Sequence, residues 1–190
     1  MAKDIGRFLQ LDSLIRKIAQ NLIDVENPDT KIAESAKKIC KLLYYTEKNP
    51  LEQPNIVERS KVDSSNTDHP TFESLSDAHQ YIMNKRVLLV PRVPAEDERG
   101  SFIVVIVDDF TLSANKQFKP SRIMFDVLVH HDDWLLENSL RPFLIMQQID
   151  NIFNGRKLSI GDVEFYSGRS VVLTEKMIGY SLVYTNVDFN

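Results

Sequence analysis

The stretch from Arg122 to Gly155 constrains the fold more than any other part of this sequence. It begins with apolar residues that alternate with more polar ones: Ile123, Phe125, Val127 and Val129. Side chains two residues apart on a strand share a face, and β-branched and aromatic side chains are the ones that strands favour. The alternation predicts an antiparallel strand with one face on the core and the other partly wet or covered by a partner.

A turn and a helix follow this strand. His131-Asp132-Asp133 is a run of polar groups that favours a turn or a helix start. From Glu137 to Asn154, apolar residues recur at spacings of three and four, with Pro142 near the start. Gly155 stands where a helix-ending glycine is favoured. The apolar stripe predicts a helix that packs on the apolar face of the strand.

Two further helices are predicted at the N-terminus, over Ile5–Val25 and Thr30–Tyr45. Asn27-Pro28-Asp29 separates them, because proline cannot continue a helix. The first helix carries a heptad-like apolar seam: Phe8, Leu11, Ile15, Ile18, Leu22 and Val25. Two short helices rarely hide all their apolar surface alone. We expect a hairpin whose seams pack on each other or on a partner, docked on the β domain or on another subunit.

The expected organisation has three parts: a helical hairpin extension over 1–46, a loop or linker over 47–71, and an α+β core domain over 72–190. The linker is polar and proline-bearing. The fold class is therefore α+β, with a mainly antiparallel sheet, a packed helix and a helical N-terminal extension. Besides the helix and strand above, the core is expected to contain a helix over 72–84 and strands over 86–93, 101–107, 163–166, 170–173 and 180–187, with a turn at 167–169.

The segment between two of these strands, Asp108 to Pro120, is too long for a tight hairpin loop. Phe110, Leu112 and Phe118 stand among its polar residues. Apolar side chains in a projecting loop predict that the loop docks on a partner. Trp134, just past the acidic turn, is expected to be buried in the core or in an interface.

Length and composition narrow the function classes. The chain has 190 residues, enough for a real core, and a net charge of −4, which disfavours a general nucleic-acid coat. The single cysteine, Cys40, excludes an internal disulfide and a cysteine-based zinc site. No apolar run approaches the ~18 residues of a membrane span, and no signal peptide is apparent. We expect folding in a reducing cytoplasm and no membrane partner.

The densest set of metal-capable side chains is His130, His131, Asp132 and Asp133. Neighbouring residues on a strand point to opposite faces, so the two histidines are not expected to share an ion. A third ligand would have to come from elsewhere, such as His69 or His79. No phosphate-binding loop or nucleophile elbow is present. We expect a turn with a charged cap, no metal, no cofactor and no catalytic residue.

The same strand-and-helix stretch also resembles a known class of proteins. Over LLYY at 42–45, NPL at 49–51, FDVLVHHDDWLLENSLRPFLIMQQIDNIFNG at 125–155 and the closing strands, the sequence resembles tailed-bacteriophage neck and tail-terminator proteins, including those of crAss-like phages. These head-to-tail connectors are small α+β subunits that form rings between portal and tail. The resemblance implies a tail-terminator-like domain in which the strand feeds a helix that packs on an antiparallel sheet.

The function that the resemblance implies is a non-enzymatic virion protein whose ring joins portal or capsid to tail and lines the DNA channel. Its partners would be further copies of itself, adjacent neck, portal or tail proteins, and genomic DNA that passes without sequence-specific binding. It would reside in the neck or tail of the virion, after assembly in the host cytoplasm. The candidate subunit-interface residues are Phe8, Leu11, Ile15, Ile18, Leu22, Phe110, Leu112, Phe118 and Trp134.

Two other functions remain open at this point. The chain could be an adaptor that binds a partner through its N-terminal helices. It could also be a small metal-dependent enzyme that uses His130, His131, Asp132 and Asp133.

Overall fold

The computed structural model describes residues 7–57, 70, 72–89, 94–95, 98–112, 118–158 and 161–187. The elements in chain order are α1 Arg7–Asn21, α2 Thr30–Tyr44, η1 Pro50–Glu52, α4 Leu75–Lys85, β1 Val87–Leu88, β2 Ser101–Leu112, β3 Phe118–His130, η2 His131–Asp133, α5 Arg141–Phe153, β4 Arg156–Leu158, β5 Gly161–Val172 and β6 Met177–Val187. No helix in these described ranges is long and apolar enough to span a membrane.

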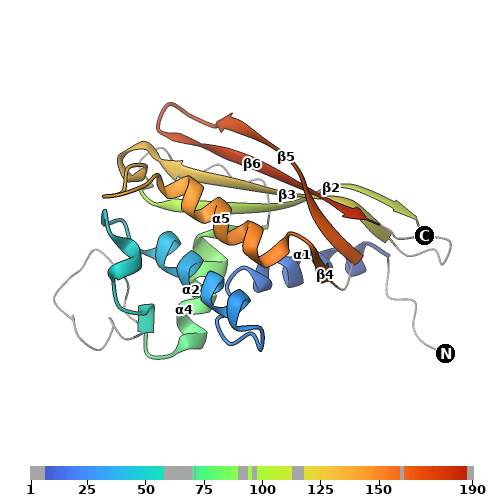
Figure 1. Ribbon diagram of the computed structural model, residues 1–190, viewed down its shortest axis with the longest axis horizontal. Helices are drawn as coiled ribbons and strands as arrows, with labels where there is room; N and C mark the ends of the chain where they lie inside the picture. The colour runs from blue at the N-terminus through green and yellow to red at the C-terminus, as the bar shows by residue number, and fades with distance from the viewer. Residues whose placement is uncertain are drawn as a thin grey trace.

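The described strands form one six-stranded sheet in the order β1-β2-β3-β6-β5-β4. Among these described strands, only the β1–β2 pair is parallel, and the other four pairs are antiparallel. The helices lie together on one side of the sheet (Figure 1). The predicted α+β class, with a mainly antiparallel sheet and a packed helix, is therefore confirmed.

The core lies between the sheet and the helices. β3 occupies the centre, with Phe125 paired to Val105 on β2 and to Leu182 on β6. Its predicted apolar face is buried, and the ring of Phe125 packs 4.8 Å from that of Phe153 on α5. α5 ends close to the predicted point, and Gly155 just beyond it has a φ of 65°, which a side chain would disfavour.

The N-terminal helices share this core. α1 lies against β2 and β3, and α2 lies against α5. α2 begins at Thr30 as predicted, and Asp29 before it is the N-cap, whose side chain accepts the backbone N–H groups of Lys31 and Ile32. Ile18, Leu22 and Ile39 are buried in one cluster with the apolar face of the sheet. The sequence left open whether the N-terminal helices dock on the β domain or on another subunit. In the structure they pack on the β domain.

Two sequence expectations were wrong, and both concern polar stretches that belong to strands. The loop expected over 108–120 is largely strand, because β2 continues to Leu112 and β3 begins at Phe118. A register shift around Asp109 lets the ladder continue past the acidic pair. The turn expected at 167–169 is also absent from the described chain. A bulge between Phe165 and Ser167 bends β5 without ending it.

Candidate functional site

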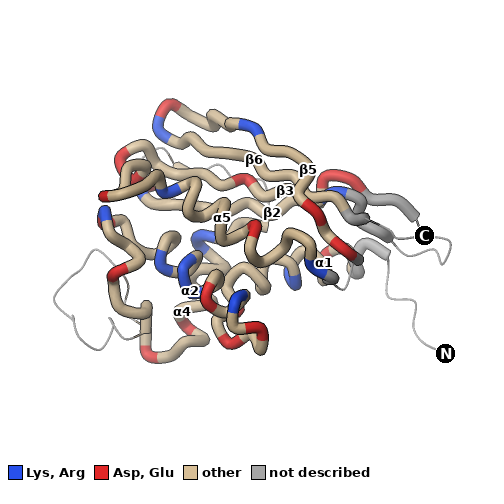
Figure 2. Tube along the Cα trace, in the orientation of Figure 1, with Lys and Arg blue, Asp and Glu red and all other residues tan. Residues whose placement is uncertain are grey.

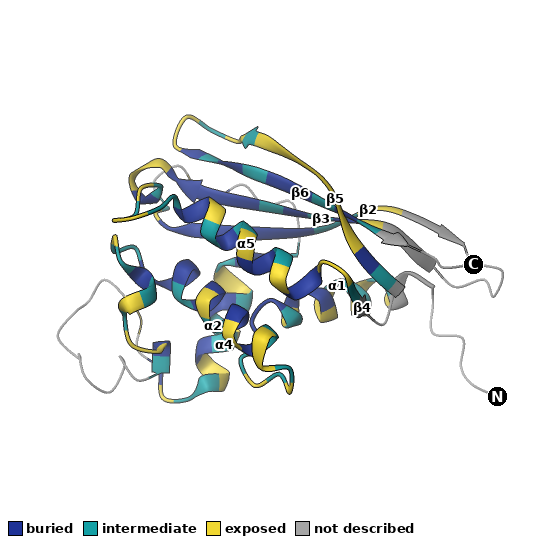
Figure 3. Ribbon diagram, viewed as in Figure 1, coloured by how far each residue is buried: buried dark blue, intermediate teal, exposed yellow. Residues whose placement is uncertain are grey.

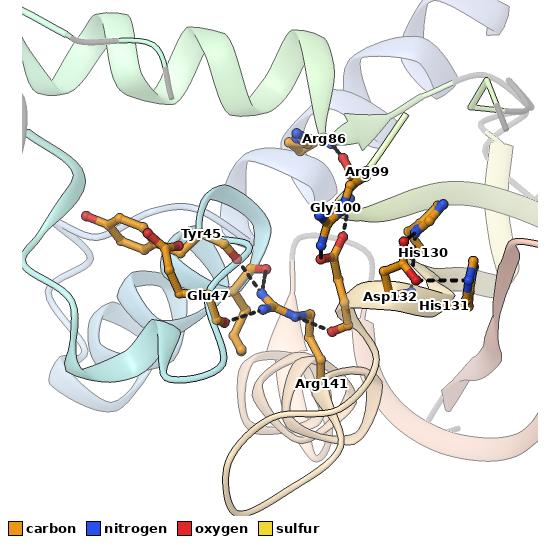
Figure 4. A network of polar contacts seen from close by, with 11 residues as sticks. Tyr45, Glu47, Arg86, Arg99, Gly100, His130, His131, Asp132 and Arg141 are labelled. Atoms are coloured by element: carbon orange, nitrogen blue, oxygen red, sulfur yellow. Dashed lines mark hydrogen bonds and ion pairs between the residues drawn. The ribbon is translucent and has the colours of Figure 1, made fainter. Parts of the chain in front are cut away.

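A buried arginine joins the helical layer to the start of α5 (Figure 4). Arg141 is 1% exposed, and burial lowers the pKa of its guanidinium to about 10. The guanidinium donates to four backbone carbonyl oxygens: those of Leu42 (3.0 Å), Tyr45 (2.5 Å), Glu47 (2.7 Å) and Asp133 (2.8 Å). We call this arrangement the arginine clip. Three of its acceptors belong to the end of α2 and the segment after it, where helical carbonyls lack partners.

Asp133 extends the clip to the beginning of β2. Its buried carboxylate accepts the backbone N–H of Gly100 at 2.8 Å and a hydrogen bond from the guanidinium of Arg99. This hydrogen bond raises the pKa of Arg99. The polar groups are therefore paired inside the fold, which points to a positioning role for the network.

The histidine turn, His130 to Asp132, lies next to this network. The ring centroids of His130 and His131 are 4.7 Å apart, and the carboxylate of Asp132 lies 2.9 Å from Nε2 of His131. The expectation that the two histidines point apart was wrong. β3 ends at His130 and a 3₁₀ turn begins at His131, so the alternation of strand side chains no longer applies. Nδ1 of His130 already accepts the backbone N–H of Asp132 at 3.3 Å.

A different kind of surface lies along β5, near one edge of the sheet. Among the described residues, four of the exposed large apolar side chains belong to β5 and the residue after it: Phe165, Tyr166, Val172 and Leu173. Val172 is 70% exposed and Tyr166 is 62% exposed. Figure 3 shows β5 exposed along most of its length, whereas β2 and β3 are largely buried where they are described. We call residues 164–173 the β5 margin.

The β5 margin is also a free strand edge. β4 pairs with β5 only between Gly161 and Val163. Beyond this point, no described strand pairs with the outer side of β5, although the N–H of Phe165 donates to the side chain of Asn154 at 3.0 Å. An edge that is long, exposed and apolar is a template for pairing with another strand.

A groove runs beside the margin on the helix side of the sheet. Its volume is about 370 Å³, and its walls include Phe143 and Met146 of α5 and Phe165 of β5. At its base, the hydroxyl of Tyr184 donates to Asp150 at 3.1 Å. Burial, and then the nearby Asp150, raise the pKa of Tyr184. The ring of Phe143 packs 5.1 Å from that of Tyr180, which leaves an aromatic wall open to solvent.

The sequence profile of one protein family, YomW, matches residues 36–186, from within α2 to the end of β6. The chain belongs to the YomW family. The family name is of the type given to proteins of a Bacillus phage, SPBc2, so the YomW chain is a phage-related protein. No curated protein and no solved structure matches the chain significantly.

The structure distributes the predicted interface residues of this YomW chain over different places. Ile18 and Leu22 are buried in the chain's own core, so here they contact its sheet and helices and not a partner. Leu11 and Ile15 are half-buried. Trp134 is half-buried too, with its ring 6.2 Å from that of Tyr180. The side chains of Phe8, Phe110, Leu112 and Phe118 lie outside the described set.

Sequence reasoning on the YomW chain missed the β5 margin, and it missed Arg141. The signal for the margin was present: Phe165, Tyr166 and the run Val171-Val172-Leu173 are apolar residues in a segment that is otherwise polar. What the sequence lacked was the strand order that leaves this segment at an edge. Arg141 gave no signal, because its acceptors are backbone atoms and three of the four are more than ninety residues away.

Proposed function

We propose that this phage-related chain is a structural virion protein whose copies form a ring in the neck or tail. The ring would join portal or capsid to tail and surround the DNA channel. The observation that carries the proposal is the β5 margin, where an unpaired edge coincides with the largest collection of exposed apolar side chains in the described chain. The margin contains two exposed charges, Glu164 and Arg169, and a bulge, yet it stays long and uncovered by any described strand, whereas a protein built to stay alone would be expected to shorten or cover such an edge.

The charge distribution supports the same function. A net charge of −4 disfavours strong binding of DNA by its phosphates, which needs clustered Lys and Arg. In the view of Figure 2, basic and acidic residues are interspersed over the described helices and turns. A channel wall of this kind would let DNA slide past, because few phosphate contacts would have to break.

The direct test is on virus particles. Virions purified from a host that carries this phage are analysed by mass spectrometry, and a specific antibody labels them for electron microscopy. We expect the chain to be present in stoichiometric amount and the label to lie at the junction of head and tail. Absence from purified virions, or label confined to the capsid surface, would overturn the proposal.

A variant of the β5 margin tests whether this surface is needed for phage assembly. Val172→Lys places a charge on the β5 margin, and Lys38→Asp changes a charge on the exposed face of α2 as the control. In a phage that depends on this gene, we expect the margin variant to leave full heads and separate tails. The control should yield joined, infectious particles. Joined particles in both would count against a role for the margin in the neck.

One observation favours a second function, that of a metal-dependent enzyme. Ligand atoms of His130, His131 and Asp132 all lie within 4.8 Å of one another, a spacing that could hold an ion. Titration of the purified chain with Zn²⁺ by calorimetry decides between the two. Stoichiometric binding that is lost in His131→Ala would favour the enzyme. We expect no stoichiometric binding, because the three residues supply few ligands and Nδ1 of His130 is already engaged.

A further inference from the structure

The outer side of the β5 margin carries backbone groups that a neighbouring strand could bind. We infer that the β5 margin of one copy pairs antiparallel with the β5 margin of a second copy across a two-fold axis. The sheets of the two copies then become one continuous sheet. The inference concerns how two copies meet in solution, so it goes beyond the proposed function and does not depend on it.

The outer side of β5 is open beyond Phe165. β4 accompanies β5 only as far as Val163, and the N–H of Phe165 donates to the side chain of Asn154. Residues 166–170 are all exposed, and so is Val172. Strand pairing needs free groups on both strands. A second copy of β5 brings the same open edge.

Alternation along β5 decides which of its backbone groups face outward. The N–H of Leu173 donates inward to Met177 at 3.0 Å. Successive residues of a strand alternate between its two sides, so Val172, Ser170 and Gly168 turn their N–H and C=O groups outward. No described backbone group bonds to these three outward N–H groups. The edge therefore offers donors and acceptors at regular intervals.

One register uses all of these groups. It places Ser170 opposite Ser170 of the second copy, on the two-fold axis, and Val172 opposite Gly168. Opposed residues of this kind exchange both of their N–H···O bonds, so no outward group of the three residues is left over. Shifting the second copy by two residues in either direction leaves some of them unpaired. One of these shifts also sets Arg169 opposite Arg169, and like charges directly opposite each other are destabilising.

The side chains fit the same register. Phe165, Gly168 and Val172 share one face of the sheet, because their partners on β6 are alternate residues. A Cβ on Gly168 would lie 3.7 Å from the ring of Phe165. Val172, which is 70% exposed, would lie opposite Gly168 of the second copy and so close to that copy's Phe165. Two apolar side chains that the single chain leaves exposed then cover each other, and the axis repeats the contact.

The contact is isologous, because both copies use the same patch. Pairing occupies the open edge of each copy, so it ends at two copies and does not propagate. On the opposite face of the paired strands, Arg169 lies across from Val171, where its aliphatic stem can cover the apolar side chain. The expected species in solution is therefore a dimer that hides the β5 margin.

A cysteine on the axis is the sharpest test. In Ser170→Cys, the two introduced residues lie directly opposite each other, about 5.5 Å apart at Cα, which a disulfide can span. In Arg169→Cys they are offset diagonally by roughly 8 Å, which is too far. The native Cys40 is buried and should stay silent. We expect mild oxidation to convert Ser170→Cys to a linked dimer and to leave Arg169→Cys monomeric. Linking of both variants alike, of Arg169→Cys alone, or of neither would overturn the inference.

Ser170→Pro tests the backbone bonds, with Ser170→Thr as the matched control. Proline removes the outward N–H, which a free edge tolerates, whereas threonine keeps it. Sedimentation velocity at rising concentration should show dimers for the wild type and the threonine variant. The proline variant should dimerise at least about tenfold more weakly, because both central bonds are lost. Circular dichroism and the melting temperature check that all three are folded. A folded proline variant that dimerises like the wild type would contradict the pairing.

These results are distinguishable from the test on virions. If the chain lies at the neck of virions but Ser170→Cys does not link, the pairing is wrong and the ring function stands. If Ser170→Cys links but the chain is absent from virions, the neck function is wrong and the pairing stands. If both hold, the ring is assembled from pairs and needs a second contact between them. A wild type that stays monomeric at every concentration would refute the pairing and leave the edge to a strand of another protein.

Discussion

The arginine clip and the β5 margin treat their polar groups in opposite ways. At the clip, a cation that is 1% exposed has four backbone acceptors, and the neighbouring Asp133 is satisfied by Gly100 and Arg99. At the margin, backbone groups face outward without a described strand beside them, among apolar side chains that stay exposed. The clip is complete within one chain, whereas we propose that a partner completes the margin.

The two regions therefore differ in the property that a substitution is expected to change. Substitution at the clip should change the free energy of unfolding of the isolated chain. Substitution at the margin should leave that free energy nearly unchanged and alter association instead. Each substitution of a buried or internally paired residue below therefore has a matched control substitution in the β5 margin.

The largest effect is expected for Arg141→Met. The change keeps much of the side chain's length but leaves four carbonyl oxygens without a donor in a buried place. A buried acceptor left without a donor costs about 1–3 kcal/mol, so the loss of four such bonds should cost at least about 3 kcal/mol. Urea denaturation should show a loss of that size, whereas Arg169→Met on the margin should lie within about 0.5 kcal/mol of the wild type. Equal losses at both positions would remove the distinction between the regions.

A pair of glycines gives the next effect. A Cβ on Gly179 would lie 1.7 Å from the carbonyl oxygen of Val127, so β3 and β6 would have to separate. A Cβ on Gly168 would meet nothing closer than 3.6 Å. We expect Gly179→Ala to cost about 3 kcal/mol, as overpacking of a tight site does. Gly168→Ala should be within about 0.5 kcal/mol of the wild type. Thermal unfolding of both variants checks the contrast.

The helices α2 and α5 and the buried face of β3 were easier to predict from the sequence. Asp29 as an N-cap, Pro142 in a first turn and Gly155 after a last turn are local signals, and the bounds of α2 and the end of α5 were accordingly found closely. The start of α5 was not, because the helix begins at Arg141 and not at the predicted Glu137. The alternation from Ile123 to Val129 fixed the buried face of β3. Such features depend on a few neighbouring residues and on the period of the structure.

The margin and the long hairpin were harder because they depend on strand order and on bulges. Asp108-Asp109 and Ser167-Gly168-Arg169 have the composition of turns, yet the ladders continue through both with register shifts. Whether a strand is central or at an edge is decided by pairing over the whole sheet. The clip has the same origin, since its acceptors are carbonyl groups that every residue carries.

A smaller effect is expected at two tyrosines. Tyr184→Phe removes the hydroxyl that donates to Asp150, at a cost of about 1 kcal/mol. Tyr166→Phe, on the margin, should change stability by less than about 0.5 kcal/mol. Because burial and Asp150 raise the pKa of Tyr184, the unfolded chain loses that proton first as the pH rises. The wild type should therefore lose stability above about pH 10 through this group, and Tyr184→Phe should lose less.

The smallest effect is expected for Asp29→Asn, and its pH dependence is what identifies it. Asparagine caps a helix about as well as aspartate, so the start of α2 should persist while the ion pair with Arg156 of β4 is lost. The hydrogen bond from Arg156 lowers the pKa of Asp29, with the backbone N–H of Lys31 adding to it. The pair thus stabilises the folded chain above the ordinary carboxyl pKa, and this contribution disappears as the pH falls through the lowered one. Melting temperatures should therefore differ slightly between wild type and variant at neutral pH and converge in acid. A difference that persists unchanged at low pH would assign the loss to the helix cap and not to the ion pair, and Glu164→Gln on the margin should show no such convergence.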